Sequence, residues 1–248
     1  MNKSDLIGAI QKYHLNGKCN DVRWEIANKS LWIDFLTDDG SMLGTVETNI
    51  DLPDNIFALF NTDKFVSMLN ALGGEIQGQY KKSGTKTLGL TFTDGVVEIY
   101  AVTYELALLL DPKNKLESFR QRGRQLNIPA VPAIEITLNQ ESIDRFLRSR
   151  KALGDAKVVG LIQGHDSVEF VINYATRNDN KINVPFPCRN LKDIDKVFMY
   201  NIDYVTSVLS ANLKFRDGSM IVTDDGMIIF DFKSEDYLAR YYLKQWDA

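Results

Sequence analysis

The chain has 248 residues, of which 44% are hydrophobic and 25% are charged, and its formal net charge is −4. This composition is ordinary for a globular protein, and it excludes a proline-rich disordered chain or a uniformly basic nucleic-acid coat. No apolar run is longer than Leu106–Leu110, which is far short of the ~18 residues that a membrane-spanning helix needs. The charged start Met1–Asp5 lacks the apolar segment of a secretory signal, so we expect a cytoplasmic protein with no membrane partner.

In the first half, the pattern predicts a helix, a hairpin, a second helix and further strands. Apolar residues at helical spacing predict a helix over Ser4–Tyr13. Two strand-like segments flank Asn28-Lys29-Ser30 and predict a hairpin there. Asn61 or Thr62 can cap the second helix, which we expect to stop at Gly73-Gly74.

The end of this half contains a turn, an apolar segment and a connector. Asp94-Gly95 predicts a hairpin turn, because both residue types tolerate positive φ. Tyr104–Leu110 is apolar on both faces, which is typical of a strand covered on both sides. Ile128–Pro132 cannot be helical because of its two prolines. We therefore expect domains at 1–112 and 133–248, joined by an extended connector at 113–132.

The second half predicts the same order of elements. We expect a helix over Gln140–Leu153, a hairpin around Gly164-His165-Asp166, and a helix that begins at Asn201 and ends near Asn212. Asp-Gly pairs predict two further hairpin turns, at Asp217-Gly218 and Asp225-Gly226.

Segments of the two halves match each other in the same order. Phe60–Leu69 and Tyr200–Leu209 share Asn, Asp, Ser and Leu at matching positions, and Leu90–Val97 resembles Met220–Ile228. Such internal similarity indicates a duplicated architecture. We predict an α+β fold of two related domains, each with two helices packed on antiparallel sheets.

The sequence offers no constellation of side chains that indicates a catalytic or metal site. The two cysteines, Cys19 and Cys188, are interpreted as reduced thiols rather than a disulfide. The only histidines are His14 and His165, so a Cys/His zinc site lacks ligands and a Ser-His-Asp triad would have to use one of these two. We expect no enzyme activity, no metal and no cofactor.

Two acidic pairs could suggest a metal site but are better explained as turns. In Asp38-Asp39-Gly40 and Asp224-Asp225-Gly226, a threonine precedes the pair and a glycine follows it. A turn accounts for all of these residues, so we interpret both segments as turns.

Basic residues on the first helix of each half are the more useful signal. Arg145, Arg148 and Lys151 are spaced by three and so share one helix face, about opposite the apolar stripe. Lys3 and Lys12 lie off the apolar stripe of the earlier helix. A solvated helix face is the alternative interpretation, but the duplication places the same type of helix in the chain twice.

The duplicated halves and their connector resemble the two-domain DNA sliding clamps, and most of all those of large tailed bacteriophages. The likeness is clearest over Ile134–Asn139 and Ser142–Leu153, where a strand that contains Glu-Ile leads into a helix. In those clamps the helix carries an apolar-apolar-Arg step, a second basic residue three positions on, then a small residue and Leu. The matching residues are Arg148, Lys151, Ala152 and Leu153.

The resemblance implies a non-catalytic processivity factor that encircles duplex DNA and tethers a replicative DNA polymerase. Such a ring needs phosphate-directed cations and no base-reading groups. It further implies a homotrimer, loaded onto DNA by a clamp-loader ATPase. The DNA-facing residues would be Lys3, Lys12, Arg145, Arg148, Arg150, Lys151 and Lys157.

The resemblance also implies surfaces for subunits and partners. The subunit interface would use Leu106, Leu108 and Leu110, facing Ile182 and Val184 of a neighbouring chain. A pocket for a partner peptide would use Ile128, Pro129, Val131, Pro132, Tyr242 and Trp246. Equally, the C-terminal aromatics could simply complete the last strand and its core.

Two alternatives stay open. One is a duplicated structural or adaptor protein with the same fold that does not encircle DNA. The other is an enzyme of a different fold, which the scarcity of histidine and nucleophile motifs argues against.

Overall fold

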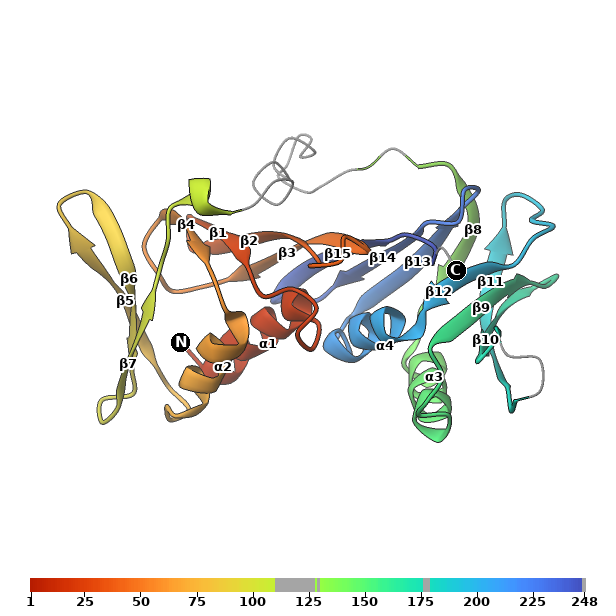
Figure 1. Ribbon diagram of the computed structural model, residues 1–248, viewed down its shortest axis with the longest axis horizontal. Coiled ribbons are helices and arrows are strands. Elements are labelled where there is room, and N and C mark those ends of the chain that lie inside the picture. The colour runs from red at the N-terminus through yellow and green to blue at the C-terminus, as the bar shows by residue number, and fades with distance from the viewer. Residues whose placement is uncertain (110–127, 129, 176–178, 247–248) are drawn as a thin grey trace. The chain divides into compact units, whose positions relative to one another are not determined.

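The computed structural model describes residues 1–109, 128, 130–175 and 179–246 (Figure 1). It divides into two compact units: Met1–Ile128 with Asp236–Ala239, and Pro129–Glu235 with Arg240–Ala248. The first break between the units falls inside the stretch 113–132 that we expected to be a connector, and most of that stretch lies outside the described residues. The sequence did not predict that Asp236–Ala239 group with the first unit.

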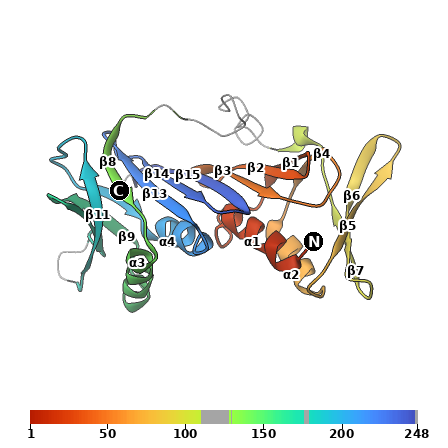
Figure 2. The same ribbon diagram turned by 180° about the vertical axis from the view of Figure 1, so that it is seen from behind.

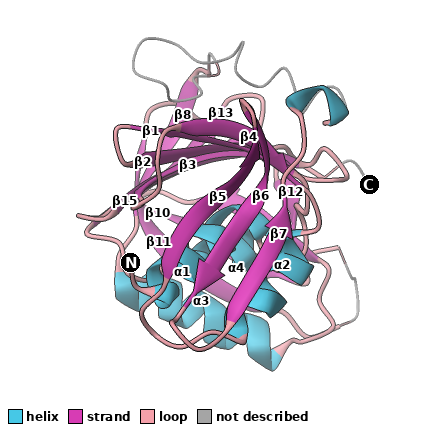
Figure 3. Ribbon diagram, turned by 90° about the vertical axis from the view of Figure 1, so that its left-hand side faces the viewer, coloured by secondary structure: helices cyan, strands magenta, loops and turns pink. Residues whose placement is uncertain are grey.

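The first unit contains two helices, a 3₁₀ turn and two sets of paired strands. The helices are α1 (Lys3–His14) and α2 (Thr62–Asn70), and the turn is η1 (Leu106–Leu108). The strands pair in the orders β3-β2-β1-β4 and β5-β6-β7, and Figure 3 looks onto the second set. Their bounds are β1 (Val22–Ala27), β2 (Ser30–Leu36), β3 (Met42–Asn49), β4 (Asn55–Leu59), β5 (Gln77–Ser83), β6 (Lys86–Thr93) and β7 (Glu98–Val102).

The second unit has the same kinds of element. Helices α3 (Gln140–Ala152) and α4 (Ile202–Ala211) contact each other, and α3 packs on β11 (Figure 2). The strands run in the order β12-β9-β10-β11-β8-β13-β14-β15. Their bounds are β8 (Pro132–Thr137), β9 (Val158–Gln163), β10 (Ser167–Ile172), β11 (Ile182–Asn190), β12 (Phe198–Asn201), β13 (Asp217–Thr223), β14 (Ile228–Lys233) and β15 (Tyr237–Leu243).

Asparagine side chains start the four helices, because each accepts a hydrogen bond from a backbone N–H of the first turn. Asn61 caps α2 by accepting from the N–H of Lys64 at 3.0 Å, and Asn139 caps α3 by accepting from Ser142 at 2.9 Å. Asn201 caps α4 in the same way. The predicted helices are therefore confirmed, although α2 ends at Asn70, before the predicted Gly73-Gly74.

Most predicted turns are also confirmed. Asn28 and Lys29 join β1 to β2 with φ of 52° and 60°, values that suit a two-residue hairpin. Asp39 accepts hydrogen bonds from Thr37 and from the N–H of Ser41, so this acidic pair forms a turn. Both cysteines are free. Among the described residues, no group of three or more His, Cys, Asp or Glu side chains could hold a metal ion.

Two predictions of local structure were wrong. Asp217-Gly218 begins β13 instead of forming a turn, and Gly218 is required there because a Cβ would meet the ring of Phe215 at 2.8 Å. Over its described residues, the segment Tyr104–Leu110 is not a strand, because Leu106–Leu108 form a 3₁₀ turn in which the N–H of Leu109 donates to the carbonyl of Leu106. Its apolar residues are not covered on both sides, since Leu108 is exposed while Leu109 is buried.

Each unit has its own aromatic core. Trp24 packs against Phe57 and Phe65 in the first unit. In the second unit, Phe146 on α3 packs against Phe170 and Phe186 on the adjacent strands β10 and β11. These cores fix the helices on the sheets and leave the opposite helix faces for other contacts. None of the described helices is long and apolar enough to cross a membrane.

Candidate nucleic-acid interface

Helix α3 presents a basic face opposite its core face. Ile143 and Phe146 are fully buried, whereas Arg148 and Lys151 are exposed and lie three residues apart on the same side. Arg145 is half-exposed and donates to Glu141 one turn earlier at 2.7 Å. Lys157, just beyond the helix, is also exposed. The guanidinium of Arg148 and the ammonium of Lys151 are thus accessible to a large anionic partner.

Arg150 has a different position from its neighbours. Its side chain is 14% exposed, and its guanidinium donates to the carbonyl of Leu153 at 2.6 Å and to Asp203 Oδ1 at 3.0 Å. Because Asp203 lies in the first turn of α4, this arginine ties the two helices together. It therefore does not belong with the exposed basic face, although the resemblance implied that it was a DNA-facing residue.

The two predicted cations of α1 are also engaged within the protein. Lys12 is 9% exposed, with its ammonium 4.0 Å from the centroid of the Tyr237 ring and 3.2 Å from the carbonyl of Gly8. Burial raises the pKa of Tyr237 to about 12, so its ring stays neutral beneath the cation. Lys3 donates to the carbonyl of Leu72. The two units therefore differ, and the exposed basic face belongs to α3.

The segment predicted as a subunit strand is not a strand, and β7, which precedes it, is an edge of the β5-β6-β7 set. Tyr100 and Val102 of β7 are 40% and 46% exposed, and a hollow of about 200 Å³ lies beside them, partly lined by α2. Leu106 is half-buried in η1, and Leu110 lies outside the described residues. Residues 98–102 include Ile, Tyr and Val, which are favoured in strands, but the sequence prediction fell on the more apolar segment that follows.

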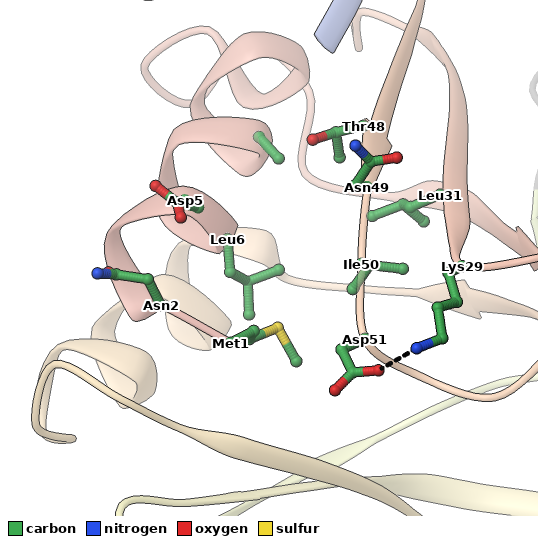
Figure 4. Close-up of a pocket in the computed structure, with 11 residues that line it drawn as sticks. Met1, Asn2, Asp5, Leu6, Lys29, Leu31, Thr48, Asn49, Ile50 and Asp51 are labelled. Atoms are coloured by element: carbon green, nitrogen blue, oxygen red, sulfur yellow. Dashed lines mark ion pairs between the residues drawn. The ribbon is translucent and has the colours of Figure 1, made fainter. Parts of the chain in front are cut away.

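A second pocket of about 490 Å³ lies between the start of α1 and strands β2 and β3 (Figure 4). Its floor is apolar, with the buried side chains of Leu6, Leu31 and Ile50. Its rim is charged, since Asp5 is exposed there and Lys29 pairs with Asp51 at 3.4 Å. None of the residues predicted for DNA, subunits or peptides lines this pocket.

The residues predicted for a partner-peptide pocket do not share one environment. Val131 and Trp246 are exposed, at 51% and 40%, whereas Tyr242 is buried within β15. Ile128 and Pro132 are partly exposed, and Pro129 lies outside the described residues. Tyr242 thus completes the last strand, and Val131 and Trp246 are the apolar side chains available to a partner.

Comparison with known proteins gives the fold but no sequence relative. No family model matches the sequence, and no curated protein matches it. The structure is similar to that of a proliferating cellular nuclear antigen from Entamoeba histolytica, with a TM-score of 0.69 and 10% identity over 99% of this chain and 96% of that chain. It is also similar to the PCNA2–PCNA3 complex from Sulfolobus tokodaii, with a TM-score of 0.67 and 9% identity over 99% of this chain and 97% of that chain.

These similarities span nearly the whole chain and both duplicated halves. They agree with the order of helices and antiparallel strands in each unit. The chain therefore has the DNA-clamp fold, an α+β fold in which each half carries two helices and antiparallel sheet, as the sequence predicted.

Proposed function

We propose that this chain is a DNA sliding clamp, a non-catalytic ring that encircles duplex DNA and tethers a DNA polymerase. The observation that carries the proposal is the similarity to nuclear antigen structures over 99% of the chain at a TM-score of 0.69. The exposed cations of α3 support it, because a sliding contact requires charge directed at phosphates and no base-specific groups.

The proposed DNA-facing residues are those whose charge is accessible. They are Arg148 and Lys151 on α3, with Lys157 beside them and Arg145 as a partly neutralised member. Lys3, Lys12 and Arg150 are left out, because each is bonded to a distant part of the chain, whereas Arg145 pairs with Glu141 on its own helix. The domain boundaries at 1–112 and 133–248 are likewise part of the proposal.

The proposed ring is a homotrimer of this chain, with β7 of one copy next to β11 of another. Exposed Tyr100 and Val102 on an edge strand support this, since an apolar edge invites pairing with a further strand. Ile182 and Val184, the partner residues predicted from the sequence, both lie on β11.

The proposed partners are a replicative polymerase and a clamp-loader ATPase, in the cytoplasm of a bacterium infected by a phage. Val131 and Trp246 are the proposed contacts for an apolar partner peptide, because both are exposed. A competing adaptor protein would have the same fold but would not encircle DNA. The deciding experiment must therefore measure an activity that depends on contact with DNA.

The experiment is a charge reversal with a matched control. Arg148→Glu with Lys151→Glu should leave folding intact and impair processive synthesis on primed DNA, equally on unrelated sequences. The control is Lys233→Glu with Lys244→Glu, which changes the same charge at two exposed lysines outside the helices and should leave synthesis unchanged. Unaltered synthesis in the α3 variant at moderate salt would favour the adaptor.

A further inference from the structure

One strand of the second unit has no counterpart among the described residues of the first. Strand β8 precedes α3 and lies between β11 and β13, so it joins the strands of that unit into one sheet. In the first unit, Asn2 caps α1 and no described strand lies between β3 and β5. The place that β8 takes in one unit is therefore without a described strand in the other.

Backbone hydrogen bonds at the start of each first helix locate that place. Leu138, directly before the cap of α3, donates to the carbonyl of Gly218 at the start of β13 at 3.0 Å. Met1, directly before the cap of α1, accepts from the N–H of Ile76 at 2.9 Å, and Ile76 directly precedes β5. The path of β8 in the second unit therefore corresponds to the outer edge of β5 in the first.

The opposite wall of this place also corresponds in the two units. The N–H of Cys188 donates to Asp166 in the turn before β10, and Cys188–Asn190 pair with β8. In the same way, the N–H of Ile50 donates to Lys29 in the turn before β2, but no described strand pairs with residues 50–52. An added strand would thus have β5 on one side and residues 50–52 on the other.

The pocket of about 490 Å³ borders this place (Figure 4). Ile50 and Asp51 line it together with the start of α1, and its size is typical of ligand pockets. Ala9 also lines it, and Ala9 and Phe146 are both the seventh residue after the cap of their helix. The first unit therefore has a methyl group where the second has a ring, which leaves room for a large apolar side chain.

The edge of β5 is suited to an added strand over four residues. Gln77 and Gln79 are exposed, and the register with β6 is regular up to Lys81. The irregular register and the exposed lysines beyond that point hinder pairing. In the corresponding strand β13, by contrast, Met220 and Val222 are buried where β8 pairs with them.

We propose that this pocket is the docking site for an extended segment of a partner protein, which adds a strand along Gln77–Tyr80 as β8 does along β13. The segment runs antiparallel to β5, as β8 runs to β13, and directs a large apolar side chain towards Ala9. In such strand addition, backbone hydrogen bonds supply affinity and alternate side chains supply specificity. The exposed cations of α3 take no part, so the inference does not rest on the proposed contact with DNA.

The test uses the full chain and, as its probe, a fluorescently labelled peptide with the sequence of Pro132–Asn139, which contains β8. Fluorescence anisotropy should show saturable binding. The same peptide methylated on the backbone nitrogens of Glu135 and Ile136 should bind on the order of tenfold more weakly or worse, because two backbone donors are lost. Neighbouring residues of a strand direct these donors to opposite sides, so the change tests both walls.

A variant of the pocket tests the side-chain contact. Ala9→Phe should weaken binding on the order of tenfold, because the ring occupies the space that an apolar side chain of the peptide needs. Gln11→Phe is the matched control, since it places the same ring on the exposed face of the same helix and should leave binding unchanged. Where Ala9→Phe fails to fold, the methylated peptide tests the site on the unaltered chain.

Hydrogen exchange followed by mass spectrometry locates the bound peptide, and protection is expected over Gln77–Tyr80. Protection of β13 or β11 instead means that the peptide has replaced β8, which overturns the inference. Absence of saturable binding, or equal binding of the methylated peptide, overturns it as well. Protection of β5 that grows with protein concentration in the absence of peptide identifies a second copy as the occupant and rejects the partner segment.

Discussion

Arg148 and Arg150 lie two residues apart on α3 but differ in environment, since Arg148 is exposed and Arg150 donates to Asp203. Replacing Arg150 by alanine removes a donor from the carbonyl of Leu153, which keeps the N–H of Ala156, and removes the guanidinium donor from the carboxylate of Asp203. A hydrogen bond to a charged group contributes about 1.5–3 kcal/mol. Because Asp203 is 39% exposed, solvent screens its share. We therefore expect Arg150→Ala to lower the free energy of unfolding by about 1–2 kcal/mol.

Arg148→Ala should change stability by no more than about 0.5 kcal/mol, because the side chain is exposed. Urea unfolding of both variants measures this difference, and thermal melting should shift by about 2–4 °C per kcal/mol for a chain of this size. The two variants should differ in the opposite sense in their effect on DNA binding. Arg148→Ala should reduce the salt slope of DNA binding by about 0.9 per lost phosphate contact, and Arg150→Ala should leave it unchanged. An Arg150→Ala protein with normal stability and a reduced slope would refute this assignment.

Three further predictions test the fold. Phe146→Ala should cost about 3–5 kcal/mol in urea unfolding, because the fully buried ring packs on Phe170, whereas Phe146→Leu should cost less. Asn61→Ala should cost about 1–2 kcal/mol, since alanine loses the cap and must hold a φ of 57°; Asn61→Gly should cost less. Backbone N–H groups, that of Val97 foremost, lower the pKa of Asp94 to about 2, below its unfolded value of about 3.9. Asp94→Asn should therefore reduce the melting temperature at neutral pH, and the difference should shrink as the pH falls from 4 towards 2; a constant difference would contradict it.

Local chemistry made the helices and hairpins predictable. An asparagine at the start of a helix accepts a hydrogen bond from a backbone N–H two or three residues later. The caps at Asn61 and Asn139 therefore depend only on local sequence. The same holds for Asn28-Lys29, whose turn depends on its own φ values. The prediction of a turn at Asp217-Gly218 was wrong because the glycine is needed for close packing against the ring of Phe215 and not for a turn.

Accessibility of the basic residues depends on distant neighbours and was not predictable. The helical pattern places Lys12 off the apolar stripe, but the ring of Tyr237 that covers it is 225 positions away in the sequence. Arg150 likewise meets Asp203, which belongs to a different helix. Spacing along one helix identifies a basic face, and only the packed fold shows which of its charged groups are buried or paired.

The edges of a sheet are a further property that sequence patterns do not reveal. Strand β5 carries exposed Lys81 and Lys82 and an irregular register between them, features that keep an edge from pairing. Strand β7, at the opposite edge, exposes Tyr100 and Val102 instead. Only one edge of this sheet is therefore suited to a second copy. Because β7 and β11 are different surfaces, a joint between them is head-to-tail, and such joints either close into a ring or extend into a filament. A sedimentation mass that stays at three times the 28.2 kDa chain as concentration rises indicates closure, whereas a mass that grows without limit indicates a filament and excludes the clamp.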